Sequence, residues 1–548
     1  MRDAGDQTGG QVLVRALEAQ GVDRLFCVPG ESYLAVLDAL HDSPIDVVVA
    51  RHEGGAAMMA EADGKLTGRP GIAFVTRGPG ATNAASGVHV AMQDSTPMVL
   101  FVGQIARGTR GREAFQEVDY RQMYGRLAKW VEEIEEPDRI PEILNHAWHV
   151  AMSGRPGPVV LTLPEDMLTS VTEASAGPLV EVAEPAPTPT AMARFAEMLA
   201  EAEAPIVIAG GSRWDGAAVE ALRFWAEAAG LPVACTFRRQ HLFDNTHPNY
   251  AGDVGLGINP RLRARIEAAD LIVLLGARFS ENPSQGFTLL DIPAPRQRLV
   301  HVHPGAEELG RIYTPYLAIS ATPGAFLAAA RDLSEQTRSL DPSVSSDYRA
   351  WSAVEAAPGA LTMSHVMQAL AESLPDDAIL TNGAGNYAIW LHRFWRYRGF
   401  GTQVAPTSGS MGYGLPAAIA AKCRHPDRPV ICLAGDGCFQ MTGQELATAR
   451  QRGAAVVVLV ADNGMYGTIR MHQERHYPHR ISATELSNPD FAALAQAHGA
   501  LGLTVGSPAE VRPALERALA SEVPALLHLK LDPEVITPSA TIASLRSG

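Results

Sequence analysis

The chain has 548 residues, of which 46% are hydrophobic and 19% are charged, a composition typical of a globular protein. At about 150 residues per domain, this length predicts three or four domains. The formal net charge of −15 argues against nucleic acid or an anionic membrane surface as the main partner.

Compartment signals favour the cytoplasm. No apolar run approaches the roughly 18 residues of a membrane span, and the N-terminal residues contain no apolar segment of a signal peptide. The five cysteines are scattered and form no CxxC pair, which fits buried or free thiols in a reducing compartment. The sequence therefore predicts a cytoplasmic protein with small-molecule ligands and no nucleic-acid or membrane partner.

The first block, residues 1–173, alternates helical and strand-like segments. Helical patterns cover 10–20 and 33–41, and strand-like apolar runs cover 24–28, 45–50, 71–76, 97–103 and 158–163. This alternation predicts a mostly parallel sheet with helices on both faces. Residues 174–190 are rich in Ala, Pro and Thr and predict an extended linker.

The second block, residues 191–335, repeats this pattern. Its strand-like runs are 205–209, 232–236, 270–276 and 298–303. Gly210-Gly211-Ser212 follows the first run, but the chain shows no full GxGxxG there, so this turn alone does not predict a dinucleotide site. The polar residues 335–360 predict a second linker, and the third block is 361–548. The fold class expected is therefore α/β, with three consecutive doubly wound domains.

The third block carries the most specific motif. Apolar runs at 429–434 and 455–460 predict two buried strands that end in Gly435-Asp436-Gly437 and Asp462-Asn463-Gly464. Neighbouring parallel strands open their carboxyl ends on one ligand-binding crevice. There a carboxylate and an amide oxygen suit Mg²⁺, and glycines let a diphosphate approach the backbone. The alternative for the GDG turn alone is a helix-capping Asp, and the Asn after the second strand argues against it.

At these residues the chain resembles the thiamine-diphosphate enzymes, whose signature is GDG followed further along by Asn-Asn. Here Asp462 replaces the first Asn. The resemblance implies that Mg²⁺ is held by Asp436, Asn463 and the backbone carbonyl of Met465.

A second motif, residues 51–83, follows a strand and opens a helix. Glu53 falls in the first turn of that helix, where the dipole favours a carboxylate, so a purely helix-stabilising role is the alternative. The segment resembles the pyrimidine-binding domain of these enzymes, most closely in the acetolactate synthase branch. By that resemblance Glu53 is the activating glutamate, which hydrogen-bonds to the cofactor's pyrimidine ring and favours the tautomer that serves as base.

The resemblance also implies contacts for further residues. Gly78, Pro79, Gly80 and Asn83 would line the thiazolium side of the cofactor, and Gln104 and Phe115 would face substrate, although a Gln at a strand end is often only a turn residue. The remaining cofactor contacts would come from the third block: Gly385, Asn386, Tyr387, Gly409, Ser410, Met411, Gly435, Gly437, Cys438, Tyr466 and Gly467.

Two of these third-block residues have plainer alternatives. Met411 would support the bent cofactor from below, and without the resemblance it is a gap-filling core methionine. Cys438 is interpreted as a small packing residue beside the metal loop rather than as a catalytic thiol.

The resemblance implies a thiamine-diphosphate- and Mg²⁺-dependent enzyme that decarboxylates a 2-oxo acid and joins the product to a second carbonyl compound. It also implies a homodimer at least, with the active site shared between subunits, and leaves a tetramer open. FAD, which acetolactate synthases carry, is not favoured, because the residues around Arg238, Arg239 and Arg278 depart from the synthase pattern. These arginines could instead hold an anionic substrate or form surface ion pairs.

Three other functions stay open at this stage. The first is a simple 2-oxo acid decarboxylase or a 2-hydroxyacyl lyase. The second is a catalytically idle cofactor-binding homologue with a regulatory or assembly role, against which the presence of Glu53, Asp436 and Asn463 argues. The third is a nicotinamide oxidoreductase, which lacks its glycine fingerprint here.

Overall fold

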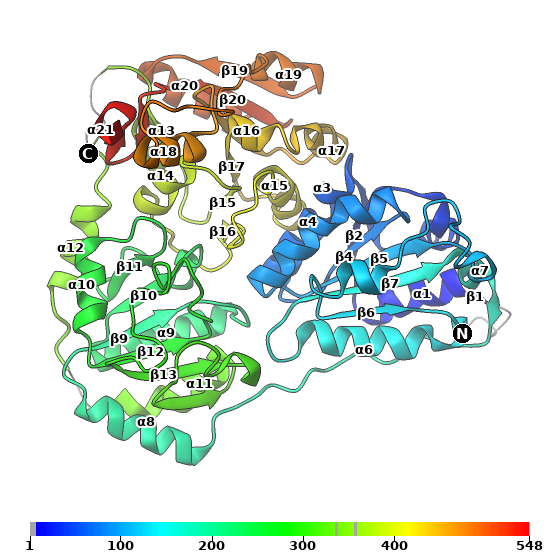
Figure 1. Cartoon of the computed structure of the whole chain (residues 1–548), viewed down its shortest axis with the longest axis horizontal. Helices are drawn as coiled ribbons and strands as arrows, with labels where there is room; N and C mark the ends of the chain where they lie inside the picture. The colour runs from blue at the N-terminus through cyan, green and yellow to red at the C-terminus, as the bar shows by residue number, and fades with distance from the viewer. Residues whose placement is uncertain (1–6, 335–337, 356–358, 547–548) are drawn as a thin grey trace. The chain divides into compact units, whose positions relative to one another are not determined.

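The computed structural model describes residues 7–334, 338–355 and 359–546. The chain divides into two compact units (Figure 1). The first reaches to Ala183 and includes Ile419–Arg424, and the second comprises Glu184–Ala418 and the chain from His425 onward. No helix among the described residues is both long and apolar enough to cross a membrane.

The first unit contains a parallel six-stranded sheet of order β3-β2-β4-β5-β7-β6. Its strands are β2 (Arg24–Cys27), β3 (Asp46–Val49), β4 (Gly71–Val75), β5 (Met98–Gln104), β6 (Trp130–Glu133) and β7 (Pro158–Pro164). Its helices are α1 (Gly9–Ala19), α2 (Leu34–His41), α3 (Glu53–Thr67), α4 (Pro79–Asp94), α5 (Tyr120–Tyr124), α6 (Ile140–Met152) and α7 (Glu165–Thr169). The short strands β1 (Gln7–Thr8) and β8 (Val171–Thr172) pair antiparallel.

The second unit contains two more sheets. The central sheet has the order β11-β10-β9-β12-β13-β14, and all its pairs are parallel. Its strands are β9 (Pro205–Ala209), β10 (Val233–Thr236), β11 (Tyr250–Val254), β12 (Leu271–Leu275), β13 (Arg298–His303) and β14 (Leu317–Ser320). Its helices are α8 (Pro189–Glu201), α9 (Gly216–Ala229), α10 (Pro260–Ala268), α11 (Pro323–Ala330) and α12 (Ser343–Trp351).

The third sheet has the order β16-β15-β17-β18-β20-β19 and is also parallel. Its strands are β15 (Ile379–Asn382), β16 (Gln403–Val404), β17 (Val430–Gly435), β18 (Val457–Asp462), β19 (Leu501–Val505) and β20 (Ala525–Lys530). Its helices are α13 (Met363–Ser373), α14 (Tyr387–Phe394), α15 (Gly414–Arg424), α16 (Asp436–Phe439), α17 (Leu446–Gln451), α18 (Gly467–His476), α19 (Phe491–Ala497) and α20 (Pro508–Leu519). The chain closes with β21 (Val535–Thr537), β22 (Ala540–Thr541) and α21 (Ile542–Arg546).

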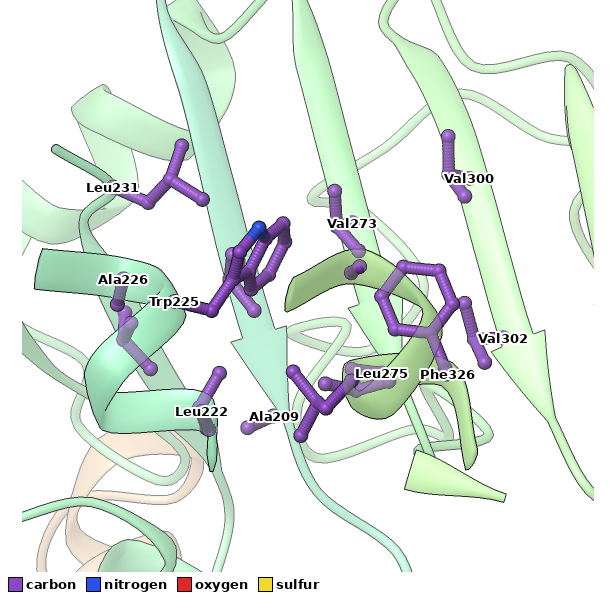
Figure 2. Close-up of a cluster of buried hydrophobic side chains, with 14 of the residues drawn as sticks. Ala209, Leu222, Trp225, Ala226, Leu231, Val273, Leu275, Val300, Val302 and Phe326 are labelled. Carbon is purple, nitrogen blue, oxygen red and sulfur yellow. The ribbon is translucent and has the colours of Figure 1, made fainter. Parts of the chain in front are cut away.

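Each sheet is held to its helices by a buried apolar layer. In the central domain, Trp225 of α9 and Phe326 of α11 lie over β9, β12 and β13 (Figure 2). Their ring centroids are 6.0 Å apart at an interplanar angle of 87°. Burying side chains of this size contributes about 1.5–3 kcal/mol each to the stability of the central domain.

The predicted fold class is confirmed, and both linker predictions are wrong in part. Residues 174–188 of the predicted linker 174–190 form no helix or strand, but its last two residues begin helix α8, and the predicted linker 335–360 contains helix α12. Tyr348 of α12 is buried, and its ring lies 4.7 Å from that of Tyr250 in the central core. Residues 335–337 and 356–358 of this prediction lie outside the described residues.

Candidate cofactor-binding and active site

Strands β17 and β18 bring the two motif turns of the third block together. They pair in parallel at the middle of the sheet, and Gly435 lies opposite Ala461. Asp436 begins the short helix α16, and Asp462 is the last residue of β18. The prediction that both turns lie at one sheet edge is therefore confirmed.

Asp436 is held in one orientation by three hydrogen bonds. Its Oδ1 accepts from the Gly437 amide (2.8 Å), and its Oδ2 accepts from the Gly464 amide (3.0 Å) and from Asn488 Nδ2 (2.8 Å). The side chain is only 3% exposed, and this burial raises the pKa of Asp436 although the hydrogen bonds oppose the rise. Three of its roughly four lone-pair directions are used, which leaves capacity for a cation.

Asp462 lies beside Asp436 in its own polar network. Its Oδ2 accepts from His528 Nε2 (2.7 Å) and Lys530 Nζ (2.8 Å), and its Oδ1 accepts from Asn488 Nδ2 (2.7 Å). Burial alone would raise the pKa of Asp462, but these hydrogen bonds bring it below its ordinary value. The carboxylate at this position is therefore paired with His528 and Lys530 through Oδ2, while Oδ1 shares the Asn488 donor with Asp436.

A cavity of about 320 Å³ opens over this edge of the sheet. The residues singled out in the sequence that line it are Gly385, Asn386, Tyr387, Gly409, Met411, Gly435, Asp436, Gly437, Cys438, Asn463, Met465, Tyr466 and Gly467. Ser410 lies between two of these residues, and its hydroxyl donates to the Met411 carbonyl (3.1 Å). The structure thus gathers these residues from four separate segments of the third block around one space.

A side chain at the glycines of this wall would fill the cavity or collide with the residues around it. A Cβ on Gly437 would lie 2.5 Å from the Tyr466 ring, and a Cβ on Gly435 would lie 3.0 Å from the Tyr387 ring. Gly385 has φ +150°, a conformation that residues with a side chain rarely adopt. This bare backbone, together with the oxygen donors of Asp436 and Asn463, fits a diphosphate with Mg²⁺.

The segment that carries Met411 is braced from behind by Cys438. The Gly412 amide donates to Cys438 Sγ (3.2 Å), and Thr442 Oγ1 donates to the Gly412 carbonyl (2.6 Å). Cys438 Sγ also lies 3.3 Å from the Tyr387 hydroxyl. Because the thiol is buried between two loops, its contacts are those of a packing residue.

The first unit holds the second group of candidate residues. Glu53 lies in the first turn of α3, as predicted, and its Oε2 accepts from Asn83 Nδ2 of α4 (2.9 Å). His52 caps the same helix, since its Nδ1 accepts from the Gly54 amide (3.0 Å). Gly80 faces Glu53, because a Cβ there would lie 3.4 Å from Glu53 Oε1. The turn 78–83 therefore fixes the carboxylate from one side.

Gln104 and Phe115 belong to one loop system. Gln104 is buried at the end of β5, where its Nε2 donates to the Val118 carbonyl (3.0 Å) and its Oε1 accepts from the Ile105 amide (2.9 Å). Both ends of its amide thus hold the loop that carries Phe115, whose side chain is 73% exposed. The loop is also tied to Gly78, whose amide donates to the Tyr120 hydroxyl (2.7 Å).

Sequence models of three thiamine pyrophosphate enzyme domains match the chain along its length. The N-terminal TPP binding domain matches residues 7–123, the central domain matches 192–330, and the C-terminal TPP binding domain matches 383–529. The chain belongs to the thiamine pyrophosphate enzyme family. It is therefore an enzyme of this family, and the domains that bind thiamine diphosphate are those that carry Glu53 and Asp436.

Curated relatives place this thiamine pyrophosphate enzyme close to the acetolactate synthase branch. The chain is 32% identical to the acetolactate synthase isozyme 2 large subunit of Escherichia coli, covering 96% of this chain and 95% of the relative. It is 32% identical to the acetolactate synthase large subunit of Corynebacterium glutamicum, covering 93% and 84%. A probable acetolactate synthase large subunit of Methanocaldococcus jannaschii is 30% identical, covering 97% and 93%.

Three polar residues of this thiamine pyrophosphate enzyme's site were not singled out in the sequence: Asn488, His528 and Lys530. His528 and Lys530 alternate along β20, and Lys530 lies opposite Asp462 in the sheet register, so strand pairing could have suggested them. Asn488 stands in a loop before α19, and nothing in its local sequence signals that its amide joins Asp436 to Asp462.

Proposed function

We propose that this protein is a thiamine-diphosphate- and Mg²⁺-dependent carboligase that decarboxylates a 2-oxo acid and joins the remaining acyl group to a second carbonyl compound. The observation that carries the proposal is that Asp436, Asn463 and Met411 line one cavity at the carboxyl edge of the third sheet. The names of the relatives, acetolactate synthases, support a reaction that yields acetolactate or a homologous product.

The residues of the chain divide the work as follows. Asp436, Asn463 and the Met465 carbonyl are proposed to hold Mg²⁺ against the diphosphate, while the backbone at Gly385 and Gly437 accommodates the phosphate oxygens. Met411 supports the rings, and its loop is fixed by Cys438 and Thr442. When bound, thiamine diphosphate supplies a nucleophilic carbon that adds to the 2-oxo acid and accepts the electron pair left when CO₂ departs.

We propose that the Glu53 carboxylate forms a hydrogen bond with the pyrimidine ring of the cofactor and exchanges a proton with it. Glu53 stands in the first turn of α3, where its Oε2 accepts a hydrogen bond from Asn83 Nδ2. We propose that Glu53 of one copy serves the cavity of a second copy in a homodimer. A cytoplasmic location is also proposed, since the five cysteines are free thiols.

We further propose that the enzyme works without FAD. In the central domain a Cβ on Gly211 would lie 1.8 Å from the Gly276 carbonyl, so the turns after β9 and β12 pack directly together. Trp214 Nε1 donates to the Gly210 carbonyl (2.8 Å), and Arg239 Nε donates to the Gly211 carbonyl (2.8 Å). The protein's own side chains thus cover the glycine turn where a dinucleotide phosphate would have to lie.

In the deciding experiment, the protein is first reconstituted with thiamine diphosphate and Mg²⁺. Pyruvate is then added, and CO₂, acetaldehyde and acetolactate are measured together. We expect acetolactate as the carboligation product. Acetaldehyde as sole organic product would replace the proposal with a simple decarboxylase. A protein that binds thiamine diphosphate yet releases no CO₂ from pyruvate or larger 2-oxo acids would instead favour a 2-hydroxyacyl lyase or a catalytically idle homologue.

A further inference from the structure

His528 is a buried histidine beside the two motif turns of the third sheet. It lies on β20, which pairs with β18, and it is 1% exposed. Its Nε2 lies 2.7 Å from Asp462 Oδ2, and its Nδ1 accepts from the Phe491 amide (3.2 Å). A ring nitrogen that accepts a hydrogen bond carries no proton, so the proton of His528 is on Nε2 and is donated to Asp462.

The neighbouring carboxylate of Asp490 does not compete for this ring. Its Oδ1 lies 3.6 Å from His528 Nδ1, beyond hydrogen-bond distance, and already accepts from two backbone amides at the start of α19. The ring of His528 is therefore held between the Phe491 amide on one side and the Asp462 carboxylate on the other. It connects the end of the loop that carries Asn488 to the end of β18.

Asp462 shares two hydrogen-bond donors with the proposed metal ligand Asp436. The Asn488 amide donates to Asp462 Oδ1 (2.7 Å) and to Asp436 Oδ2 (2.8 Å). The Gly464 amide lies 3.1 Å from Asp462 Oδ1 and 3.0 Å from the same Asp436 oxygen. The orientation of Asp462 therefore affects both donors that hold Asp436 Oδ2.

Aromatic contacts give His528 a second route to Asp436. The Phe491 ring meets the His528 ring with centroids 4.9 Å apart at 77°, and it meets the Phe439 ring with centroids 5.5 Å apart at 87°. All three rings are at most 2% exposed. Phe439 ends the short helix α16, which Asp436 begins. Hydrogen bonds and packing thus lead from His528 to the same carboxylate.

Lys530 is the other cation donor to Asp462 Oδ2, but it differs from His528 in exposure. Its Nζ lies 2.8 Å from that oxygen, and its side chain is 51% exposed. Water can take the place of an exposed donor, whereas a buried acceptor that loses its donor stays unpaired. The donor that Asp462 cannot replace is therefore the buried His528.

We propose that His528 is a positioning residue of the metal site, whose Nε2–H fixes Asp462 and thereby holds Asp436 in the orientation that binds Mg²⁺. The inference rests on the proposed function, which assigns Mg²⁺ to Asp436. His528 acts through its neighbours and supplies no metal ligand. Loss of a group that orients a metal ligand typically weakens metal binding by about 10–100-fold.

Two substitutions of His528 separate the Nε2 donor from the space that the ring fills. Glutamine can place an N–H group near the position of Nε2, whereas the shorter asparagine can replace only Nδ1. Binding of thiamine diphosphate to the full-length protein is followed by intrinsic fluorescence at a series of Mg²⁺ concentrations, without substrate. We expect His528→Asn to weaken Mg²⁺ binding by about 10–100-fold, and His528→Gln to stay within about threefold of the wild type.

A third variant covers the case in which His528→Asn does not fold. His528→Phe keeps an aromatic ring against Phe491 and removes both nitrogens, so it should weaken Mg²⁺ binding as much as His528→Asn. The matched control is His301→Asn, because His301 is a buried histidine of the central domain whose Nε2 donates to the Ala277 carbonyl (2.9 Å). This control should keep wild-type Mg²⁺ affinity.

The outcomes separate a positioning role from a structural one. Equal losses in His528→Gln and His528→Asn would overturn the inference, as would wild-type Mg²⁺ affinity in His528→Phe. Thiamine diphosphate binding that needs no Mg²⁺ in the wild type would overturn it together with the metal site. The expected order of Mg²⁺ affinities in a protein that forms no acetolactate would support the inference and overturn only the proposed reaction.

Discussion

At the scale of single residues, the carboxylate of Glu53 is the group with the most direct consequence for the reaction. Its Oε2 accepts from Asn83 Nδ2, and its Oε1 faces Gly80, where there is no side chain. Glu53→Gln should keep thiamine diphosphate affinity and fold but lower kcat by on the order of 10²–10⁴-fold, the range for a lost proton-transfer group. Steady-state kinetics with calorimetric cofactor binding checks this.

A surface variant provides the control for Glu53→Gln. Glu142 of helix α6 is exposed and pairs with Arg139, the residue just before the helix, so Glu142→Gln removes the same charge with no expected change in kcat. A Glu53→Gln protein as fast as the wild type would remove the activating role from this residue.

Asn488 controls the orientation of the metal-site carboxylate. Its Nδ2 bridges Asp436 and Asp462, and its Oδ1 accepts from Gln440 Nε2 (3.0 Å). Asn488→Ala removes the bridge and leaves two neighbouring carboxylates to repel each other. Since loss of a partner of a metal ligand typically costs about 10–100-fold in metal affinity, we expect that weakening for Mg²⁺. The measurement is the Mg²⁺ dependence of thiamine diphosphate binding, followed by intrinsic fluorescence.

Gln440→Ala separates the bridge from the loop around it. This variant removes only the contact to the Asn488 oxygen and keeps both hydrogen bonds to the carboxylates, so Mg²⁺ affinity should change less than twofold. Asn488→Ala with wild-type Mg²⁺ affinity would show that the Asp436 carboxylate is positioned by its backbone partners, Gly437 and Gly464, without the amide.

At the scale of elements, the strands that the sequence pattern identified are mainly those inside the sheets. Interior strands such as β17 and β18 are buried on both faces, so their sequences are continuous apolar runs. Within the three six-stranded sheets, the strands that the sequence pattern did not predict are all at sheet edges: β6, β11, β14, β16 and β19. β14 alternates buried and exposed residues, and β11 is interrupted by Gly252 and Asp253, so neither strand forms a continuous apolar run.

The same contrast holds for the site. Residues that follow interior strands, such as Asp436 and Asn463, were predictable because the strand ends must share one crevice. Asn488 reaches the site through a loop whose course depends on tertiary packing, so no local pattern indicates its partners. Gln104 was expected to face substrate, and the structure shows both ends of its amide bonded to the backbone of its own loop.

The turns after β9, β10 and β12 lead to a prediction about flavin. Trp214 and Arg239 bond to the carbonyls of the glycine turn, and Gly276 packs against Gly211. We therefore expect the purified protein to show no visible flavin absorbance. Added FAD should change neither activity nor thermal unfolding, because a ligand that binds the folded state raises stability. Stoichiometric flavin released on denaturation would contradict this reading of the central domain.

At the scale of the whole molecule, the two groups of site residues lie in different compact units of the chain: Glu53 in the first, and Asp436 and Asn463 in the second. In the proposed homodimer, each active site takes its glutamate from one copy and its metal ligands from the other. Twofold symmetric dimers repeat the same contact twice, so one dimer would then contain two such sites.

With this arrangement, two variants that are each inactive alone should regain activity when their chains form mixed dimers. A dimer that joins one Glu53→Gln copy to one Asp436→Ala copy has one site with both defects and one site with neither. If equal amounts of the variants are unfolded and refolded together, about half of the dimers are mixed, and the preparation should recover about a quarter of wild-type activity. The measurement is turnover of the mixture against each variant refolded alone. If each chain instead used its own Glu53, every site in the mixture would carry a defect and activity would stay at the level of the separate variants.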